Sequence, residues 1–287
     1  MANVVINDAN LTNIAAAIRE KNGSTDTYKP NEMAAAIRAI SVNPGGGDTP
    51  ASSIDFEDYI GRTLTGEVEL TCERVGNYGL AGFWQVNKFT VHGNASGNNA
   101  FAGCTNLQEI NITEEATIGK NSCSGLTKLT TVNAPLATEI DEKAFYSCSA
   151  LTDVTLGDVV RLGKSAFEGC NKLTKIDLGN TEQAHSYYSL WIGPYLYESV
   201  FSSCNALTAI IIRGKVPCCL SQYGSPFPSH FRTDYTGTLE PGYIYVPRDM
   251  ISEYQNYQAN VYGMSPYYDH FTMMNYRAIE DYPDICG

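Results

Sequence analysis

Cysteine is the reactive residue type that recurs most regularly in this chain. Of nine cysteines, four stand three residues after a phenylalanine and three before a leucine, namely Cys104, Cys148, Cys170 and Cys204. A ladder of thiols could bind a metal or form disulfides, and Cys148 and Cys170 occupy neighbouring repeats within disulfide reach. However, Leu126 fills the equivalent position of another repeat, and the chain contains no Cys-x-x-Cys pair. We therefore predict reduced thiols that fill a core.

Other side chains with catalytic or metal-binding chemistry show no matching pattern. The four histidines are dispersed and form no His-x-x-x-His pair, namely His92, His185, His230 and His270. No Gly-x-Ser-x-Gly, phosphate-binding loop or dinucleotide-binding loop is present. We predict no metal site, no cofactor and no catalytic residues.

Aromatic residues are concentrated in the C-terminal part of the chain, where 15 of the 19 tyrosines follow residue 180. Tyrosine and tryptophan combine a large contact area with a polar tip, which suits the binding of sugars and proteins. We predict that the following aromatic residues bind a ligand: Tyr187, Tyr188, Trp191, Tyr195, Tyr223 and Phe227. The alternative is that these side chains pack against the C-terminal end of the fold.

An internal repeat must position these residues. The phrase Ala-Phe-x-x-Cys-x-x-Leu-x-x-Ile/Val-x-Leu/Ile starts at residue 144 and again, 22 residues later, at residue 166. Its leucine position recurs at Val86, Leu107, Leu129, Leu151, Leu173 and Leu207. A period in the twenties is typical of a solenoid, in which each unit buries its apolar face on its neighbours. The last step of 34 residues indicates an insertion of 12 residues, which we place at 180–195.

Each repeat predicts two strands. Apolar residues three and five after the leucine should point inward from a main strand, and six such strands would form a parallel sheet roughly 25 Å across. An apolar residue five before the phenylalanine predicts a second, shorter strand, at Val75, Ile118, Ile140, Leu162 and Leu196, with Ser96 as the exception. The outward positions are Thr90, Asn111, Asn133, Thr155, Asp177 and Ile211. These could contact a glycan, although any exposed sheet carries polar residues.

The N-terminal segment has a different pattern. Leu11, Ile14 and Ile18 share one face of a predicted helix, and Met33 and Ile37 share one face of a second, so residues 1–40 predict a helical hairpin. Two short helices are marginal alone, and the hairpin should attach to the solenoid, to copies of itself or to a larger assembly. A Gly/Pro-rich linker at 41–53 separates it from the solenoid at 54–215, and favours attachment elsewhere over capping.

Composition narrows the class of partner. The chain has 19 Lys and Arg against 31 Asp and Glu, a formal charge of -12, which disfavours nucleic acids and anionic membrane surfaces. The N-terminus has neither a basic segment nor an apolar segment typical of a secretory signal, and no apolar run is long enough to span a membrane. We expect synthesis in a cytoplasm and no membrane insertion.

The repeated phrase resembles the BspA-like leucine-rich repeats of surface proteins from gut and oral microbes and of phage virion proteins, over about residues 75–215. The resemblance implies a mostly β fold with short helices, a leucine-rich-repeat-like solenoid of about six 22-residue repeats preceded by the helical hairpin. Residues 244–254 resemble the strand and short helix that close such arrays, and Met250, Ile251 and Tyr254 have the spacing to cover the last repeat. The aromatic-rich region 216–287 is therefore expected to be a cap.

A second resemblance concerns the N-terminal segment. Residues 11–21 and 30–37 look like the N-terminal helical segment of tail-fibre and other minor structural proteins of phages that infect gut Firmicutes. This implies a non-enzymatic virion component, fibre-like or receptor-binding, that contacts other virion proteins through the hairpin and a host-surface glycan or protein through the solenoid. Such a component is expected to be a homo-oligomer. The alternatives are a bacterial or protist cell-surface adhesin and, third, a glycan-active enzyme with two facing carboxylates.

Overall fold

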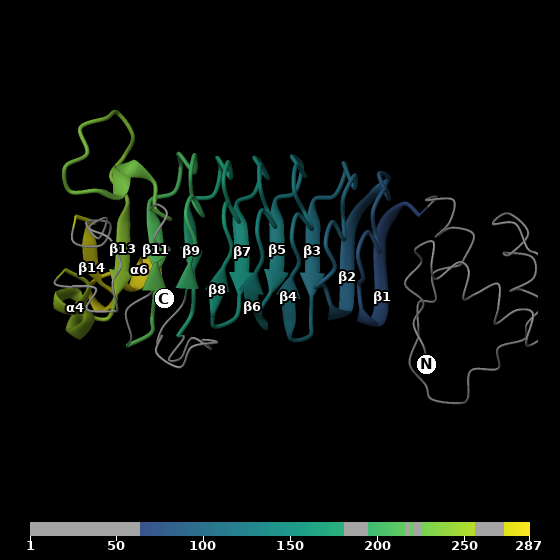
Figure 1. Ribbon diagram of the computed structural model, residues 1–287, viewed down its shortest axis with the longest axis horizontal. Coiled ribbons are helices and arrows are strands. Elements are labelled where there is room, and N and C mark those ends of the chain that lie inside the picture. Colours follow the sequence, from purple (N-terminus) through teal and green to yellow (C-terminus); the bar gives the residue numbers. More distant parts are fainter. Residues whose placement is uncertain (1–63, 181–194, 216–218, 221–224, 256–272) are drawn as a thin grey trace, which may run out of the picture.

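The computed structural model describes residues 64–180, 195–215, 219–220, 225–255 and 273–287. They form an elongated stack of parallel strands that advances along one axis from β1 to β14 (Figure 1). The N-terminal hairpin with its attachment candidates, the linker and most of the insertion lie outside the described residues. The mostly β solenoid predicted from the repeat is confirmed.

The face that carries the main strand of every repeat consists of two sheets. The first, here called the front sheet, contains β1 Gly66–Arg74, β2 Val86–Asn94, β3 Glu109–Ile112, β5 Thr131–Ala134 and β7 Asp153–Leu156. The second, the C-terminal sheet, contains β9 Lys175–Asp177, β11 Ala209–Ile211, β13 Tyr243–Val246 and β14 Tyr276–Ala278. All neighbours within each sheet pair in parallel.

The predicted short strands form a third sheet, the back sheet. It contains β4 Ala116–Ile118, β6 Ala137–Ile140, β8 Arg161–Leu162, β10 Tyr195–Leu196 and β12 Cys219–Leu220. The prediction is wrong for Val75, which follows the nine-residue strand β1 and belongs to no short strand. Ser96, the expected exception, follows the nine-residue strand β2 and also belongs to none. The longer strands replace the separate short ones there.

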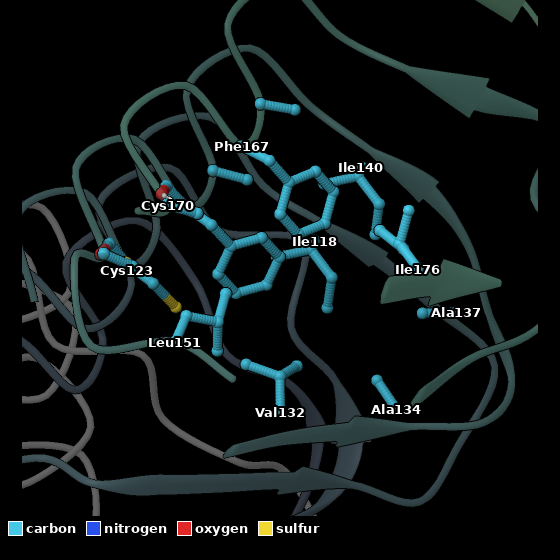
Figure 2. Packing of buried hydrophobic residues seen from close by; sticks show 14 of the residues in the cluster. Ile118, Cys123, Val132, Ala134, Ala137, Ile140, Leu151, Phe167, Cys170 and Ile176 are labelled. Carbon is cyan, nitrogen blue, oxygen red and sulfur yellow. Dashed lines mark hydrogen bonds between the residues drawn. The ribbon is translucent and has the colours of Figure 1, made fainter. Parts of the chain in front are cut away.

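The core is a set of ladders that run along the axis. Phenylalanine rings stack between repeats, with centroids 5.1 Å apart for Phe145 and Phe167. The leucine and cysteine positions of the repeats are fully or almost fully buried, and Figure 2 shows Cys123, Leu151, Phe167 and Cys170 pointing into the same interior as Ile118 and Ile140 of the back sheet. Burying one such large apolar side chain contributes roughly 1.5–3 kcal/mol, so the repeated phrase accounts for much of the stability.

Two residues with positive φ shape the turns of every repeat. Asn121 and Gly125 illustrate the two positions, with φ of 54° and 74°. Side chains with a Cβ rarely adopt this backbone conformation, and glycine adopts it without strain. The same two positions recur in each turn, at Tyr78 and Gly82, Asn99 and Gly103, Lys143 and Ser147, Ser165 and Gly169, and Ser199 and Ser203.

The C-terminal part continues the stack beyond the repeats. β13 continues the C-terminal sheet from β11, and the helices η2 Arg248–Met250 and α4 Ile251–Gln255 follow it. Met250 and Tyr254 are buried in the main core, and Ile251 is partly buried against it. A last segment, η3 Ile279–Asp281 and α6 Pro283–Cys286, returns over the outer face of the C-terminal sheet.

One expectation about the front face is wrong. The main strands do not form one continuous sheet, because no ladder joins β7 to β9, whereas the back sheet runs unbroken from β4 to β12. In regular repeats the N–H groups of Thr152 and Asp153 donate to the carbonyl of Thr130. The equivalent bonds from Thr174 and Lys175 to Thr152 are not formed within the described residues. We call this interruption the seam.

Candidate functional site

A groove of about 650 Å³ lies along the seam. Val154 and Leu156 of β7 should be fully buried like their counterparts in other repeats, but both are only half-buried because the sheet is open beside them. Their side chains give the groove an apolar floor. Its edges are polar and include Asp153, Thr155 and Asp158 on one side and Thr174, Lys175, Asp177 and Asn180 on the other.

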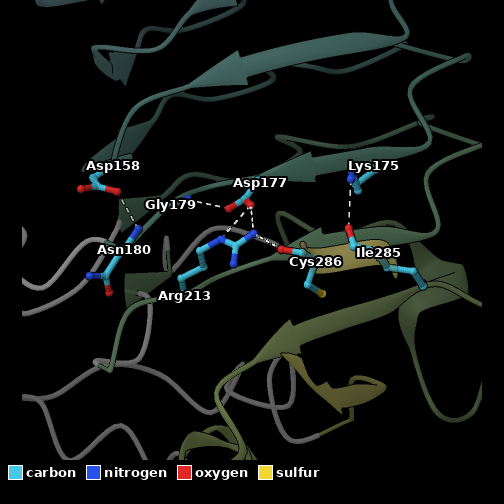
Figure 3. Close-up of polar contacts among 8 residues, drawn as sticks. All are labelled: Asp158, Lys175, Asp177, Gly179, Asn180, Arg213, Ile285 and Cys286. Carbon is cyan, nitrogen blue, oxygen red and sulfur yellow. Dashed lines mark hydrogen bonds and ion pairs between the residues drawn. The ribbon is translucent and has the colours of Figure 1, made fainter. Parts of the chain in front are cut away.

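The residues after the two strands fix the shape of the groove (Figure 3). The Asp158 carboxylate accepts a hydrogen bond from the Asn180 backbone N–H at 2.7 Å, and the Asp177 carboxylate accepts one from the Gly179 N–H at 2.9 Å. Gly179 has φ of 75°, and a Cβ there would lie 2.5 Å from an Asp158 oxygen. Glycine is therefore required where the chain leaves β9 and passes Asp158.

Arg213 closes the C-terminal end of the groove. Its Nε and Nη2 both donate to Asp177 Oδ2, at 2.9 and 2.6 Å. The same Nη2 donates to the carbonyl of Cys286, and Lys175 Nζ donates to the carbonyl of Ile285 at 2.9 Å (Figure 3). Two cations thus hold the carbonyl end of α6, an arrangement that helix C-termini favour.

These contacts fasten residues 279–287, here called the C-terminal strap, over the C-terminal sheet. A second, smaller core forms beneath the strap from Ala209, Ile211, Tyr245 and Cys286. Ile211 was predicted as an outward position. The strap covers this position and buries the Ile211 side chain, which is consistent with an apolar residue there. The exposed polar row of the front face therefore ends before β11.

A second hollow of about 510 Å³ lies beside the strap and shares Thr174 and Lys175 with the groove. Its other lining residues come mainly from β11, β13, β14 and α6, and include Thr208, Glu240, Tyr243, Arg277 and Asp284. The guanidinium carbon of Arg277 lies 3.4 Å from the centroid of the Tyr243 ring and 4.7 Å from that of Tyr282. We call this the tyrosine–arginine hollow.

The predicted ligand-binding aromatics fall into three groups. Tyr187, Tyr188, Trp191 and Tyr223 lie outside the described residues. Tyr195 belongs to β10, where its backbone pairs with Arg161 and Cys219. Phe227 is only 6 % exposed and belongs to the main core, so its prediction as a ligand contact is wrong and the packing alternative holds for it.

The cysteine ladder has a role that the sequence did not reveal. Each thiol donates a hydrogen bond to a backbone carbonyl of the preceding turn, as Cys148 Sγ does to Cys123 O at 3.1 Å and Cys170 Sγ to Phe145 O at 3.2 Å. The seven cysteines whose side chains are described are free thiols. Burial raises the pKa of Cys148 and of Cys204 to about 12. The prediction of buried core thiols is confirmed.

The histidines with described side chains are hydrogen-bonded within the fold. The buried His230 Nε2 lies 2.6 Å from the Leu207 carbonyl, to which it donates. His92, on the surface, contacts the Glu69 carboxylate at 2.5 Å and the Thr113 hydroxyl at 3.0 Å. Within the described ranges, no three His, Cys, Asp or Glu side chains gather in a way that could hold a metal ion, and no helix is long and apolar enough to cross a bilayer.

The sequence did not predict the seam, because the seam is an absence of backbone hydrogen bonds between β7 and β9. No residue type indicates such an absence. One sequence feature did point toward it, since the period breaks just after Leu178. The groove is lined by Gly179, Asn180 and Arg213 among others, and the insertion placed at 180–195 begins at Asn180. The groove and the predicted ligand-binding residues are therefore adjacent along the chain.

The chain is similar to solved structures of leucine-rich repeat proteins. Among curated proteins, none matches the chain. A leucine-rich repeat protein of Bacteroides ovatus has a similar structure, with a TM-score of 0.47 and 17% identity over 75% of this chain and 54% of the other, so the match spans about half of that protein. A leucine-rich repeat protein of T. pallidum gives a TM-score of 0.32 and 17% identity over 57% of this chain and 70% of the other.

The repeats themselves match a family model. Residues 94–190 match the model described as BspA type Leucine rich repeat region (6 copies). The matched range contains the strands from β3 to β9 and ends within the insertion. Residues 94–190 of this chain are thus similar to BspA type leucine-rich repeats.

Proposed function

We propose that this chain is a non-enzymatic binding protein that recognises a ligand on a host cell surface through the seam groove. The observation that supports the proposal is the interruption between β7 and β9, along which the groove lies. Ligand sites are typically concave, with an apolar floor and a few polar groups that fix orientation. Val154 and Leu156 supply the floor, and Asp153, Thr155 and Lys175 supply polar groups at the edges.

Backbone carbonyl and N–H groups beside the groove provide further hydrogen-bonding partners for a ligand. Thr152 O and the Thr174 and Lys175 N–H groups do not pair across the seam as their counterparts do in regular repeats. Backbone donors and acceptors beside an open groove can bind hydroxyl or amide groups of a ligand. The three aspartates at the edges accept hydrogen bonds from within the protein, through Arg213, Asn180 N–H and the Thr152 hydroxyl. They therefore help to shape a polar surface.

The finer proposal is a fibre-like or receptor-binding component of a phage virion. Its support is the resemblance of residues 11–21 and 30–37 to helical segments of phage minor structural proteins. The hairpin would attach the chain to other virion proteins and, by self-association, make it a homo-oligomer. The solenoid would present its groove and insertion to the host. Mass spectrometry of purified virions tests this role. Detection of the chain on bacterial cells and not in virions would favour the adhesin alternative.

A substitution in the groove tests the binding role directly. Thr155→Trp places a large ring in the groove from an exposed position of β7, and we expect adsorption of the protein to host cells to fall about tenfold or more. Thr90→Trp makes the same change at the equivalent position of β2, outside the groove, and should leave adsorption unchanged. Equal adsorption of both folded variants and the original protein would contradict the proposal. Hydrolysis of host glycans by the purified protein would instead favour the enzyme alternative.

A further inference from the structure

The tyrosine–arginine hollow contains an arginine that no carboxylate neutralises among the described residues. Four other arginines form ion pairs with Asp or Glu, namely Arg161, Arg213, Arg232 and Arg248. Arg277 forms none with the acidic residues that the structure describes. Its hydrogen bond to a described residue is a long one, from Nη1 to the Tyr245 hydroxyl at 3.4 Å.

The geometry leaves the donors of Arg277 available. The guanidinium lies over the Tyr243 ring, at 3.4 Å from its centroid, so the ring covers a face of the group. The N–H donors lie in the plane of the guanidinium, and five of them are arranged in a fixed fork that matches a carboxylate. The ring therefore holds the fork in place without occupying its N–H donors, of which Nη1 makes the long hydrogen bond to Tyr245.

The rest of the hollow suits a ligand with hydroxyl groups. Glu240 and Asp284 line it as carboxylate acceptors, and Thr208 adds a hydroxyl at one side. Lys175 also lines it, but its ammonium group donates to the Ile285 carbonyl. Two carboxylates near one available guanidinium disfavour polyanions, and they accept hydrogen bonds from neutral donors such as sugar hydroxyls.

We propose that the tyrosine–arginine hollow binds an acidic monosaccharide unit, with its carboxylate on the Arg277 fork and its hydroxyls on Glu240 and Asp284. The hollow of about 510 Å³ lies within the size range of small-ligand sites. This inference rests on the proposed function, because it names the chemical class of surface ligand. The hollow shares Thr174 and Lys175 with the seam groove, so one saccharide chain can occupy both.

The test compares two sugars that differ only in the acidic group, methyl β-D-glucuronide and methyl β-D-glucoside, titrated into the full chain and followed by NMR or calorimetry. We expect the glucuronide to bind about tenfold more tightly or better, since a charge-assisted bidentate pair is lost with the glucoside. Arg277→Gln should reduce glucuronide binding to the glucoside level. Arg277→Lys, which keeps the charge but not the fork, should retain part of the preference.

Controls separate binding from structural support. Arg161→Gln removes an arginine from the back sheet, together with its ion pairs to Glu139 and Asp141, and should leave the binding of both sugars unchanged. Melting curves identify any Arg277 variant that unfolds, in which case Arg277→Lys carries the test. Equal binding of the two sugars, no binding of either, or an unchanged preference in Arg277→Gln would overturn the inference.

Two further outcomes concern the ligand class and the proposed function. Tighter binding of a blocked Gly-Glu-Gly peptide than of the glucuronide would overturn the saccharide assignment in favour of an acidic peptide. Host-cell adsorption, measured on the same variants, is a separate readout. Adsorption that persists while glucuronide selectivity is absent would overturn this inference alone, and a complete lack of adsorption by the original protein would overturn the proposed function.

Discussion

The ring of Phe201 stacks on that of Phe167, with centroids 5.8 Å apart and an interplanar angle of 17°, although the two residues are 34 positions apart in the sequence. Phe145 and Phe167 stack in the same way across the regular step of 22 residues. Cys204 Sγ also keeps the ladder contact, with a hydrogen bond of 3.0 Å to the Phe167 carbonyl. The insertion therefore leaves the core register unchanged.

Removing the insertion should separate folding from binding. Deletion of residues 182–193 restores the regular step, and we expect the free energy of unfolding to stay within about 1 kcal/mol of the original, because loop length changes stability only slowly. Adsorption to host cells should fall, because the deletion removes Tyr187, Tyr188 and Trp191. Urea denaturation and an adsorption assay check the two parts. Full adsorption by the folded deletion variant would refute a binding role for these aromatics.

The positive-φ positions give a paired test of backbone strain. Gly125 has φ of 74° and open space where a Cβ would be, so Gly125→Ala should destabilise the protein by about 1 kcal/mol through the backbone alone. Ser147 occupies the same turn position of the next repeat with φ of 57°, so Ser147→Gly should stabilise it by about 0.5–1 kcal/mol. Chemical denaturation of both variants measures the changes. Effects of the same sign would contradict this explanation.

The buried thiols predict how stability depends on pH. In the unfolded chain a thiol ionises near pH 8.5–9, whereas burial raises the pKa of Cys148 and Cys204 to about 12 in the folded protein. Their contribution to stability is therefore complete below about pH 9 and is lost as the pH rises toward 12, by up to about 1.4 kcal/mol per pH unit for each thiol.

Urea denaturation between pH 8 and pH 11 checks this dependence. Cys148→Val removes one titrating thiol, so the fall in stability above about pH 9 should be shallower by the share of one group. The same substitution removes the thiol donor to the Cys123 carbonyl, which still accepts from the Leu126 N–H, so stability should fall at all pH values by about 1 kcal/mol. A slope identical to that of the original protein would show that Cys148 does not titrate on unfolding.

The interior of the solenoid could be predicted from the sequence because every repeat must bury apolar side chains at the same positions. Phe145, Cys148 and Leu151 are buried, and the same positions of the next repeat are buried as well. The period alone fixes which side chains point inward, since a stack of similar turns brings equivalent residues into contact. The hydrogen bond of each thiol could not be predicted, because Leu126 in the same position indicated packing alone.

The candidate site was less predictable, because it depends on contacts between distant parts of the chain. Val154 and Leu156 are apolar residues at positions that are buried in the other repeats. They form the floor of the groove only because no backbone ladder joins β7 to β9 beside them. Arg277 approaches Tyr243 through the return of β14 next to β13, which no repeat pattern encodes. Phe227 lies in an aromatic segment whose composition suggested ligand binding, yet its side chain is buried in the core.

The contact between Arg213 and Asp177 gives a last prediction, about the C-terminal strap. Arg213 joins β9 to the strap because it donates to the Asp177 carboxylate and to the Cys286 carbonyl. The Arg213 and Asp177 side chains are 36% and 34% exposed, so solvent screens the pair and its net contribution should be about 1 kcal/mol or less. The main consequence of Arg213→Met should therefore be local.

Hydrogen exchange measures that local effect. In Arg213→Met we expect faster exchange at residues 279–287 and unchanged exchange in β3 and β5, because the second core beneath the strap is small and separate from the main core. Arg232→Met removes an arginine that pairs with Asp234 elsewhere and should leave the strap protected. If both variants protect residues 279–287 equally, the small apolar core alone holds the strap, and Arg213 serves only to shape the end of the groove.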